Sequence, residues 1–235
     1  MPEILLEAQN LTKRFRLRGG RRHAMTAVDG ASLQLAKGET VGLLGESGSG
    51  KSTLGQMLTG LIRPDGGTIE YRGQRLGFPF RGDARRRIQI LFQHPEVSFN
   101  PQLTLRRSLT EPFRLRGLPC ADRDLLACIA AFGLHAEHLD RLPGELSGGE
   151  LQRAALARIV VLEPEIILLD EPTSMLDVIT QAQMIHFLRQ YQREHRTTYL
   201  FITHNSTLAE QVCGRILHIH AGRLSPCDSA ESRRT

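Results

Sequence analysis

The stretch TVGLLGESGSGKS, residues 40–52, decides the fold of this chain. It opens with a short apolar run, which is typical of a strand buried inside a parallel sheet. The rest of it fits the phosphate-loop pattern G-x-x-x-x-G-K-[ST] at every fixed position. Apolar side chains then recur at helical spacing, at Leu54, Met57, Leu58 and Leu61. A buried strand, a glycine loop and a helix follow each other as a phosphate-binding loop requires, so we predict an α/β fold.

The glycines of this loop let the backbone approach a ligand and turn its N–H groups inward, which makes a nest for an anion. We expect Lys51 to reach the β- and γ-phosphates of a nucleotide and Ser52 to ligate Mg²⁺. A glycine-rich turn without a ligand is the alternative, and the preceding strand argues against it. The candidate nucleotide-binding residues of this loop are Gly45, Glu46, Ser47, Gly48, Ser49, Gly50, Lys51, Ser52 and Thr53.

A second apolar run, residues 166–169, leads directly into Asp170 and Glu171. Ligands of parallel sheets bind at the carboxyl ends of the strands, where these two carboxylates would lie. We expect Asp170 to hold Mg²⁺ and Glu171 to polarise an attacking water. A surface Asp-Glu pair before Pro172 is the simpler interpretation, but a phosphate loop in the same chain favours the catalytic one.

Size and composition suit one sizeable domain. The chain has 235 residues, of which 40% are hydrophobic, and no apolar run approaches the roughly 20 residues of a membrane span. The N-terminus is acidic and has no apolar segment typical of a signal peptide, so we expect a cytosolic protein. The cysteines, expected to be reduced thiols because no two have metal-ligand spacing, are Cys120, Cys128, Cys213 and Cys227.

The net charge of +5 is compatible with nucleic acid, an anionic membrane surface or an ordinary charged surface. No basic stretch is interleaved with aromatic residues, so we favour the charged surface and expect no nucleic-acid partner. Prolines break residues 94–158 into short, mostly helical pieces. We predict a single domain with a core of about 1–93 and 159–223, a helical arm of about 94–158 and a short C-terminal tail, 224–235.

The stretch Leu-Ser-Gly-Gly-Glu, residues 146–150, has two interpretations. Ser147 and Glu150 form a capping box, which only starts a helix. Gly148 and Gly149, however, each cost about 1 kcal/mol relative to alanine in a helix interior, and less in the first turn. Their presence suggests that a group approaches the backbone, and a phosphate at the helix N-terminus is the natural candidate.

Taken in this order, the phosphate loop, the stretch 146–150 and the Asp-Glu strand end resemble the ATP-binding cassette (ABC) ATPases. The resemblance implies a P-loop NTPase (RecA-like) parallel-sheet core, an antiparallel β subdomain and a helical signature subdomain. It also implies that two cassettes hold two ATP molecules between them. The signature residues, which would contact the γ-phosphate of the ATP on the second cassette, are Ser147, Gly148, Gly149 and Glu150.

The resemblance assigns further roles. Gln93 matches the glutamine that contacts Mg²⁺ and the attacking water, and His204 matches the histidine that contacts the γ-phosphate. Asp177 would work across the dimer interface. Phe15 matches an aromatic residue that stacks on adenine, with a core phenylalanine as the competing interpretation and Tyr71 as a weaker aromatic candidate. The other eight histidines receive no functional role.

Residues 92–101, FQHPEVSFNP, resemble the matching segment of oligopeptide, dipeptide and nickel importers. This implies a second ATPase subunit, identical or different, two transmembrane permease subunits and an extracytoplasmic substrate-binding protein. The chain would sit at the cytoplasmic face of the membrane and drive uptake of a peptide, nickel or a metal–chelator complex. The chain ends soon after the last expected strand, as in shorter nickel and metallophore subunits.

Three residues depart from the family pattern without removing a catalytic group: His94, Met175 and Asn205. A soluble ABC ATPase of DNA repair or chromosome maintenance is the alternative function, but no heptads of a long coiled coil separate the phosphate loop from the signature. A P-loop kinase or GTPase would lack the signature, and no Asn-Lys-x-Asp motif for guanine is present.

Overall fold

The computed structural model describes residues 2–16 and 24–226. The chain divides into two compact units, which are described separately: Met1–Arg85 with Thr198–Thr235, here called the phosphate-loop unit, and Arg86–Thr197, here called the helical unit. Cys227 and residues 227–235 of the expected tail lie outside the described residues.

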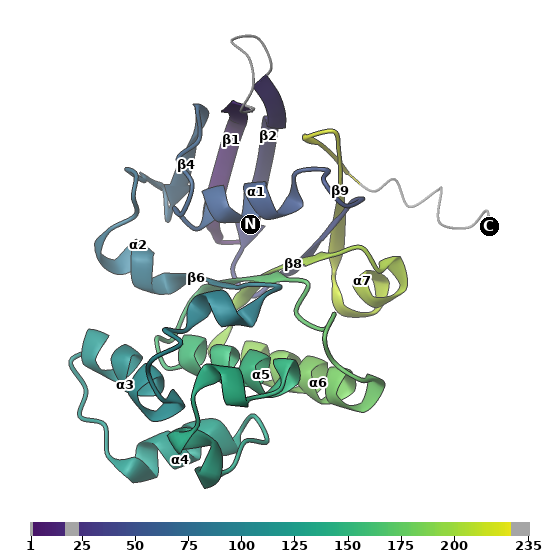
Figure 1. Ribbon diagram of the computed structural model, residues 1–235. Helices are drawn as coiled ribbons and strands as arrows, with labels where there is room; N and C mark the ends of the chain where they lie inside the picture. Colours follow the sequence, from purple (N-terminus) through teal and green to yellow (C-terminus); the bar gives the residue numbers. More distant parts are fainter. Residues whose placement is uncertain (1, 17–23, 227–235) are drawn as a thin grey trace. The chain divides into compact units, whose positions relative to one another are not determined.

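An antiparallel sheet forms one part of the phosphate-loop unit, with the strand order β2-β1-β4-β5 (Figure 1). Side chains such as Leu6, Leu11 and Val28 are completely buried on its inner face, and burial of such apolar surface is the main favourable term in folding. The bounds are β1 (Ile4–Arg16), β2 (Ala24–Ala36), β4 (Gly66–Tyr71) and β5 (Gln74–Arg75).

The same unit contains strands in the order β10-β9-β3-β8, in which β3 is parallel to both β8 and β9. Every residue of β3 and β8 is buried, as continuous apolar runs require in a parallel sheet. The bounds are β3 (Thr40–Leu44), β8 (Thr198–Thr203), β9 (Arg215–His220), β10 (Arg223–Pro226), α1 (Lys51–Leu58) and α7 (Ser206–Val212).

The C-terminal tail differs from the prediction at its first residues. The sequence predicts a C-terminal tail from residue 224, but Leu224 pairs with Ile219 within the antiparallel β9–β10 hairpin. The turn of this hairpin is tied to β2, because the backbone N–H of Asp29 donates to the carbonyl oxygen of Gly222 at 2.9 Å. Polar composition misled the prediction, since an antiparallel edge strand needs few apolar residues.

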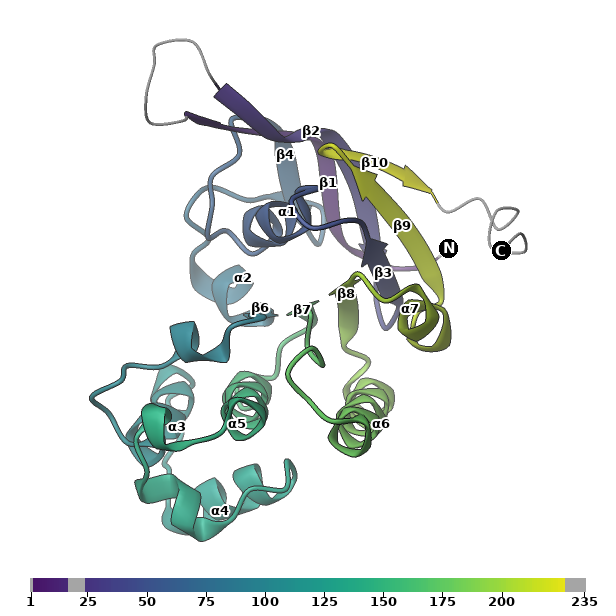
Figure 2. The same ribbon diagram turned by 45° about the vertical axis from the view of Figure 1, so that its right-hand side comes forward.

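The helical unit contains a pair of parallel strands and the helices α3 to α6 (Figure 2). The apolar faces of α3, α4 and α5 supply its buried core, with Leu105, Leu109, Ile129 and Leu156 fully inaccessible. The bounds are β6 (Ile88–Leu91), β7 (Ile166–Asp170), α3 (Leu105–Leu115), α4 (Asp122–Ala130), α5 (Gly148–Val160) and α6 (Val178–His195). Short 3₁₀ turns connect them: η1 (Pro95–Ser98), η2 (Ala136–Asp140) and η3 (Pro143–Glu145).

Helix α2 (Gly82–Arg87) spans the boundary between the two units. Among the helices of the described chain, none is both long enough and apolar enough to cross a membrane.

Candidate functional site

The phosphate loop is wrapped around the ammonium group of Lys51. Its Nζ donates to the carbonyl oxygens of Gly45 and Glu46, each at 2.7 Å. The side chain is buried although it carries a charge, because these two carbonyls compensate for the lost water. The loop therefore holds a fixed positive charge at the start of α1, where the free N–H groups of the helix also favour an anion.

Glycine is required at two positions of this loop. A Cβ on Gly45 would lie 2.4 Å from the carbonyl oxygen of Ile219, and one on Gly50 would lie 2.2 Å from that of Ala27. Gly50 also has φ +108°, a conformation that other residues rarely adopt. Strands β9 and β2, which belong to the same unit, therefore lie so close to the loop that neither position has room for a side chain.

His204 lies beside the phosphate loop. In the parallel pairing of β3 with β8, Leu44 is opposite Thr203, so the next residues are Gly45 on one strand and His204 on the other. His204 is exposed, and Asn205 after it caps α7 by accepting the N–H of Leu208 at 3.0 Å. The register brings the predicted histidine to the sheet edge that carries the loop.

The two aromatic candidates for adenine differ in exposure. Phe15 lies on β1 and is partly exposed, with the Nζ of Lys13 5.7 Å from the centre of its ring. Tyr71 is buried on β4, with 7% of its surface exposed. Of these two rings, Phe15 is the more exposed.

In the helical unit, Gln93 and Glu171 are joined directly. The side-chain Nε2 of Gln93 donates to Oε2 of Glu171 at 2.9 Å. Glu171 has φ +46°, a left-handed conformation that is uncommon for a residue with a side chain. The N–H and hydroxyl of Ser174 donate to its carbonyl oxygen at 3.2 and 3.0 Å, which holds this turn. Asp170, the preceding residue, is 5% exposed.

The signature residues form the predicted capping box at the start of α5. The N–H and hydroxyl of Ser147 both lie 2.8 Å from Oε2 of Glu150, and the N–H of Glu150 donates back to the Ser147 hydroxyl at 3.3 Å. These hydrogen bonds from Ser147, with a smaller contribution from His138, lower the pKa of Glu150 to about 2. A Cβ on Gly149 would lie 3.1 Å from Leu176, so this glycine is also close to the 174–177 segment.

Asp177 caps α6. Its Oδ1 accepts the N–H groups of Ile179 and Thr180, both at 3.0 Å, and its Oδ2 accepts the Thr180 hydroxyl at 2.6 Å. These hydrogen bonds, led by the one from the Thr180 hydroxyl, lower the pKa of Asp177. Within a single chain, the Asp177 side chain therefore stabilises the N-terminus of α6.

The predicted site residues fall into two groups, each assembled within its own unit. The phosphate-loop unit carries residues 45–53, Phe15 and His204. The helical unit carries Gln93, Asp170, Glu171, the signature 147–150 and Asp177.

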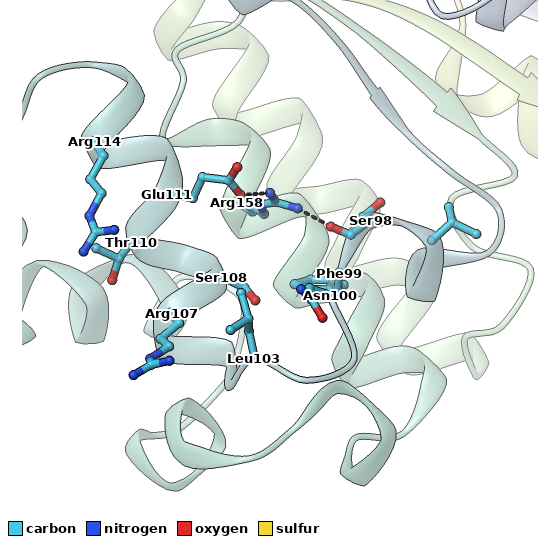
Figure 3. A pocket seen from close by; sticks show the side chains of 11 residues that line it. Ser98, Phe99, Asn100, Leu103, Arg107, Ser108, Thr110, Glu111, Arg114 and Arg158 are labelled. Carbon is cyan, nitrogen blue, oxygen red and sulfur yellow. Dashed lines mark hydrogen bonds and ion pairs between the residues drawn. The ribbon is translucent and has the colours of Figure 1, made fainter.

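A pocket of about 830 Å³ lies between η1, the segment after it, α3 and α5 of the helical unit (Figure 3). On one side Arg158 binds Glu111 and the carbonyl oxygen of Ser98, and its guanidinium lies 5.8 Å from the ring centre of Phe99. On the other side Arg107 and Arg114 of α3 line the pocket, and within the described residues neither side chain has a hydrogen bond or an ion pair. Apart from the basic residues of α3, no sequence pattern indicates this pocket.

Sequence reasoning also missed His138, which received no role. It is 5% exposed on η2, and its Nε2 lies 3.1 Å from Oε1 of Glu150. The contact between His138 and Glu150 is visible only in the folded chain, because the two residues are twelve positions apart and the 3₁₀ turn η3 lies between them.

A glycine loop that follows a buried parallel strand and leads into a helix defines the class of P-loop nucleotide-binding proteins. Residues 28–174 match the family model described as ABC transporter. The chain is 38% identical over 233 residues to the oligopeptide transport ATP-binding protein AppF of Bacillus subtilis, covering 94% of this chain and 71% of AppF. The chain belongs to the ABC transporter family.

Two further comparisons support the same family and fold. The chain is 39% identical over 228 residues to the nickel import ATP-binding protein NikE of Pseudomonas putida, covering 94% of this chain and 84% of NikE. The dimeric structure of MJ0796, a bacterial ABC transporter cassette, superposes with a TM-score of 0.83 at 27% identity, covering 94% of this chain and 97% of that one. The predicted family and fold class are confirmed.

Proposed function

We propose that this chain is the ATP-binding and ATP-hydrolysing subunit of a membrane importer, located at the cytoplasmic face of the membrane. The observation that carries the proposal is the phosphate loop wrapped around Lys51, in a chain that resembles import ATP-binding proteins over 94% of its length. As part of this proposal, residues 1–235 form one ATPase domain with a core, a helical arm at about 94–158 and a short tail.

The nucleotide-binding role rests on charge. Lys51 would neutralise the β- and γ-phosphates, and the N–H groups of residues 45–53 would donate to their oxygens. Phe15 would stack on adenine, and His204 would contact the γ-phosphate. The oxygen donors of Ser52, Gln93 and Asp170 suit Mg²⁺, which prefers few protein ligands besides phosphate oxygens and water. When bound, Mg²⁺ would offset the charge that develops during phosphoryl transfer.

Hydrolysis would depend on Glu171, which would polarise the attacking water. The hydrogen bond from Gln93 orients this carboxylate, and the turn at Ser174 fixes its backbone. The dimer would complete the site, because Ser147, Gly148 and Gly149 would meet the γ-phosphate held by the second ATPase subunit, identical or different, with Glu150 holding the start of their helix. Asp177 would act at the same interface in addition to capping α6.

The pocket of the helical unit would receive a cytoplasmic helix of a permease subunit. Arg107, Thr110 and Arg114 lie on one side of α3, at spacings of three and four residues. Because Arg107 and Arg114 have no partner within the described residues, the complementary occupant is a helix that presents carboxylates. Movement of the arm upon hydrolysis would then be transmitted to the two permease subunits.

The cargo class is a peptide, nickel or a metal–chelator complex, delivered by an extracytoplasmic binding protein. Identity to the oligopeptide relative and to the nickel relative is nearly equal, 38% and 39%, so it does not choose between these cargoes. Transport assays with each cargo, in vesicles that contain the permease subunits, would show which of the three is taken up.

The proposed activity is tested with Glu171→Gln. We expect this variant to bind ATP normally, while phosphate release falls by about 10²–10⁴-fold, the contribution of a positioned general base. Near-normal turnover would refute the role of Glu171. ATPase activity stimulated by DNA, rather than by permease subunits, would instead favour the function in DNA repair or chromosome maintenance.

A further inference from the structure

His138 is connected to the signature serine through one carboxylate. Its Nδ1 accepts the N–H of His135 at 2.9 Å, so a neutral ring carries its proton on Nε2, which faces Oε1 of Glu150 at 3.1 Å. A protonated ring would donate its second N–H to the carbonyl oxygen of His135, 3.1 Å away. In both states Nε2 donates to Glu150. All members of this chain of contacts belong to the helical unit.

The hydroxyl proton of Ser147 is already engaged in a hydrogen bond to Glu150. An ionised carboxylate only accepts hydrogen bonds, so the 2.8 Å contact between the Ser147 hydroxyl and Oε2 of Glu150 requires the hydroxyl to donate. The terminal phosphate of ATP also only accepts. Ser147 has one hydroxyl proton, so it cannot serve both anions at once and must turn that proton away from Glu150 to bind the phosphate.

We propose that His138 is a positioning residue for the signature: it holds the Glu150 carboxylate while Ser147 turns its hydroxyl proton toward the terminal phosphate. This inference rests on the proposed contact between Ser147 and ATP. After the turn, Glu150 keeps the N–H of Ser147 on Oε2 and His138 on Oε1. Without His138, the partly buried carboxylate of Glu150 would keep only the N–H of Ser147 after the turn. Release of the Ser147 hydroxyl from Glu150 would then cost more free energy.

The neighbouring charges do not replace His138. On η2 itself, Glu137 is paired with Arg141, and Asp140 is paired with Arg106 of α3. His135 contributes its backbone to His138, and its ring centre lies 5.7 Å from that of His138. The donors that the structure gives Glu150 within the described residues are therefore Ser147 and His138.

Two substitutions separate this role from simple packing. His138→Asn keeps a polar group near the position of Nδ1 but cannot reach Glu150, whereas His138→Gln carries an amide N–H near the position of Nε2. His135→Ala is the matched control, because His135 is exposed and bonds His138 through its backbone. ATP-dependent phosphate release is measured for each variant in vesicles that contain the full complex, together with the thermal midpoint.

We expect His138→Asn to raise the KM for ATP about tenfold with kcat within about twofold, the effect of one hydrogen bond to a charged group. His138→Gln should stay within about twofold of the unmodified protein, and His135→Ala should be unchanged. An unchanged KM in His138→Asn overturns the inference. Equal KM increases in His138→Asn and His138→Gln, following a fall in thermal midpoint, also overturn it.

A double-mutant cycle with Ser147→Ala distinguishes this inference from the function on which it rests. If His138 acts through Ser147, His138→Asn should change the KM by less than about twofold once the hydroxyl is absent. A full tenfold effect in that background contradicts the inference alone. If Ser147→Ala itself leaves the KM for ATP unchanged, the Ser147 hydroxyl does not bind the terminal phosphate. Both the proposed dimer site and the inference then fail.

Discussion

The amide of Gln93 holds the carboxylate of Glu171, with 2.9 Å between Nε2 and Oε2. The strand register explains this contact. Strands β6 and β7 are parallel, with Leu91 opposite Leu169, and Gln93 and Glu171 each follow this pair by two residues, just beyond the ends of the strands. Two residues that are 78 positions apart in the chain are thus brought together by four backbone-paired positions.

Removal of the amide should impair hydrolysis rather than ATP binding. In Gln93→Ala, Glu171 loses its orienting donor, and we expect kcat for phosphate release to fall about tenfold or more. In Gln93→Glu, a second carboxylate faces Glu171 and disfavours its ionised form, so the fall should be larger. Phosphate release and fluorescent ATP binding measure the two effects. Higher activity in Gln93→Glu than in Gln93→Ala would contradict this account.

Gly50 should tolerate substitution less well than Gly48. Both have positive φ, +108° and +79°, so alanine is strained at each, by about 1–2 kcal/mol. Only at Gly50 would the new Cβ meet a backbone oxygen, 2.2 Å away, whereas at Gly48 nothing lies within 4 Å. We expect Gly50→Ala to lose about 1–3 kcal/mol more than Gly48→Ala.

Thermal unfolding of the ligand-free protein measures this difference, at about 2–4 °C per kcal/mol for a chain of this size. Equal midpoints for the two variants would show that the loop can move away from Ala27 without cost.

The phosphate loop, the strand ends and the signature could be predicted because each residue there has a backbone or charge role that fixes its type. The pairing that brings Gln93 to Glu171 could not be predicted, because β6 contains Gln89 and only its first and last residues are buried. The pocket and the role of His138 could not be predicted, since they depend on how short turns pack onto α3 and α5. Strand β10 has no apolar pattern, so the sequence predicts a tail where this strand begins.

The capping carboxylate should stay ionised in mild acid. The pKa of Glu150 is lowered from 4.5 to about 2, mainly by the hydrogen bonds from Ser147. A lowered carboxyl pKa stabilises the folded state fully above the unfolded pKa, and this contribution is lost as the pH falls through the folded pKa. The stability difference between the unmodified protein and Glu150→Gln should therefore be constant from pH 7 to about 5 and decline toward pH 2.

Urea unfolding of both proteins across this range tests the prediction, because changes at other carboxyl groups cancel in the difference. A difference that has already disappeared at pH 5 would mean that Ser147 does not hold the ionised carboxylate.

Charge reversal in the pocket should weaken assembly with the permease. In Arg107→Glu or Arg114→Glu, an unpaired cation becomes an anion, and we expect affinity for the permease subunits to fall about tenfold or more. Arg123→Glu is the control, because its side chain is 89% exposed on α4, outside the pocket. Co-purification at low and moderate salt measures the effect. Equal losses for all three variants would point to general charge rather than to the pocket.

The central claim is that one ATP is held by the Lys51 loop of one subunit and the Ser147 helix end of another. Sedimentation of Glu171→Gln together with its cognate ATPase subunit, saturated with ATP and Mg²⁺, tests it most directly. We predict a dimer that forms only with ATP and that is lost when Ser147→Arg is added on both signatures. A protein that stays monomeric under these conditions would contradict the claim.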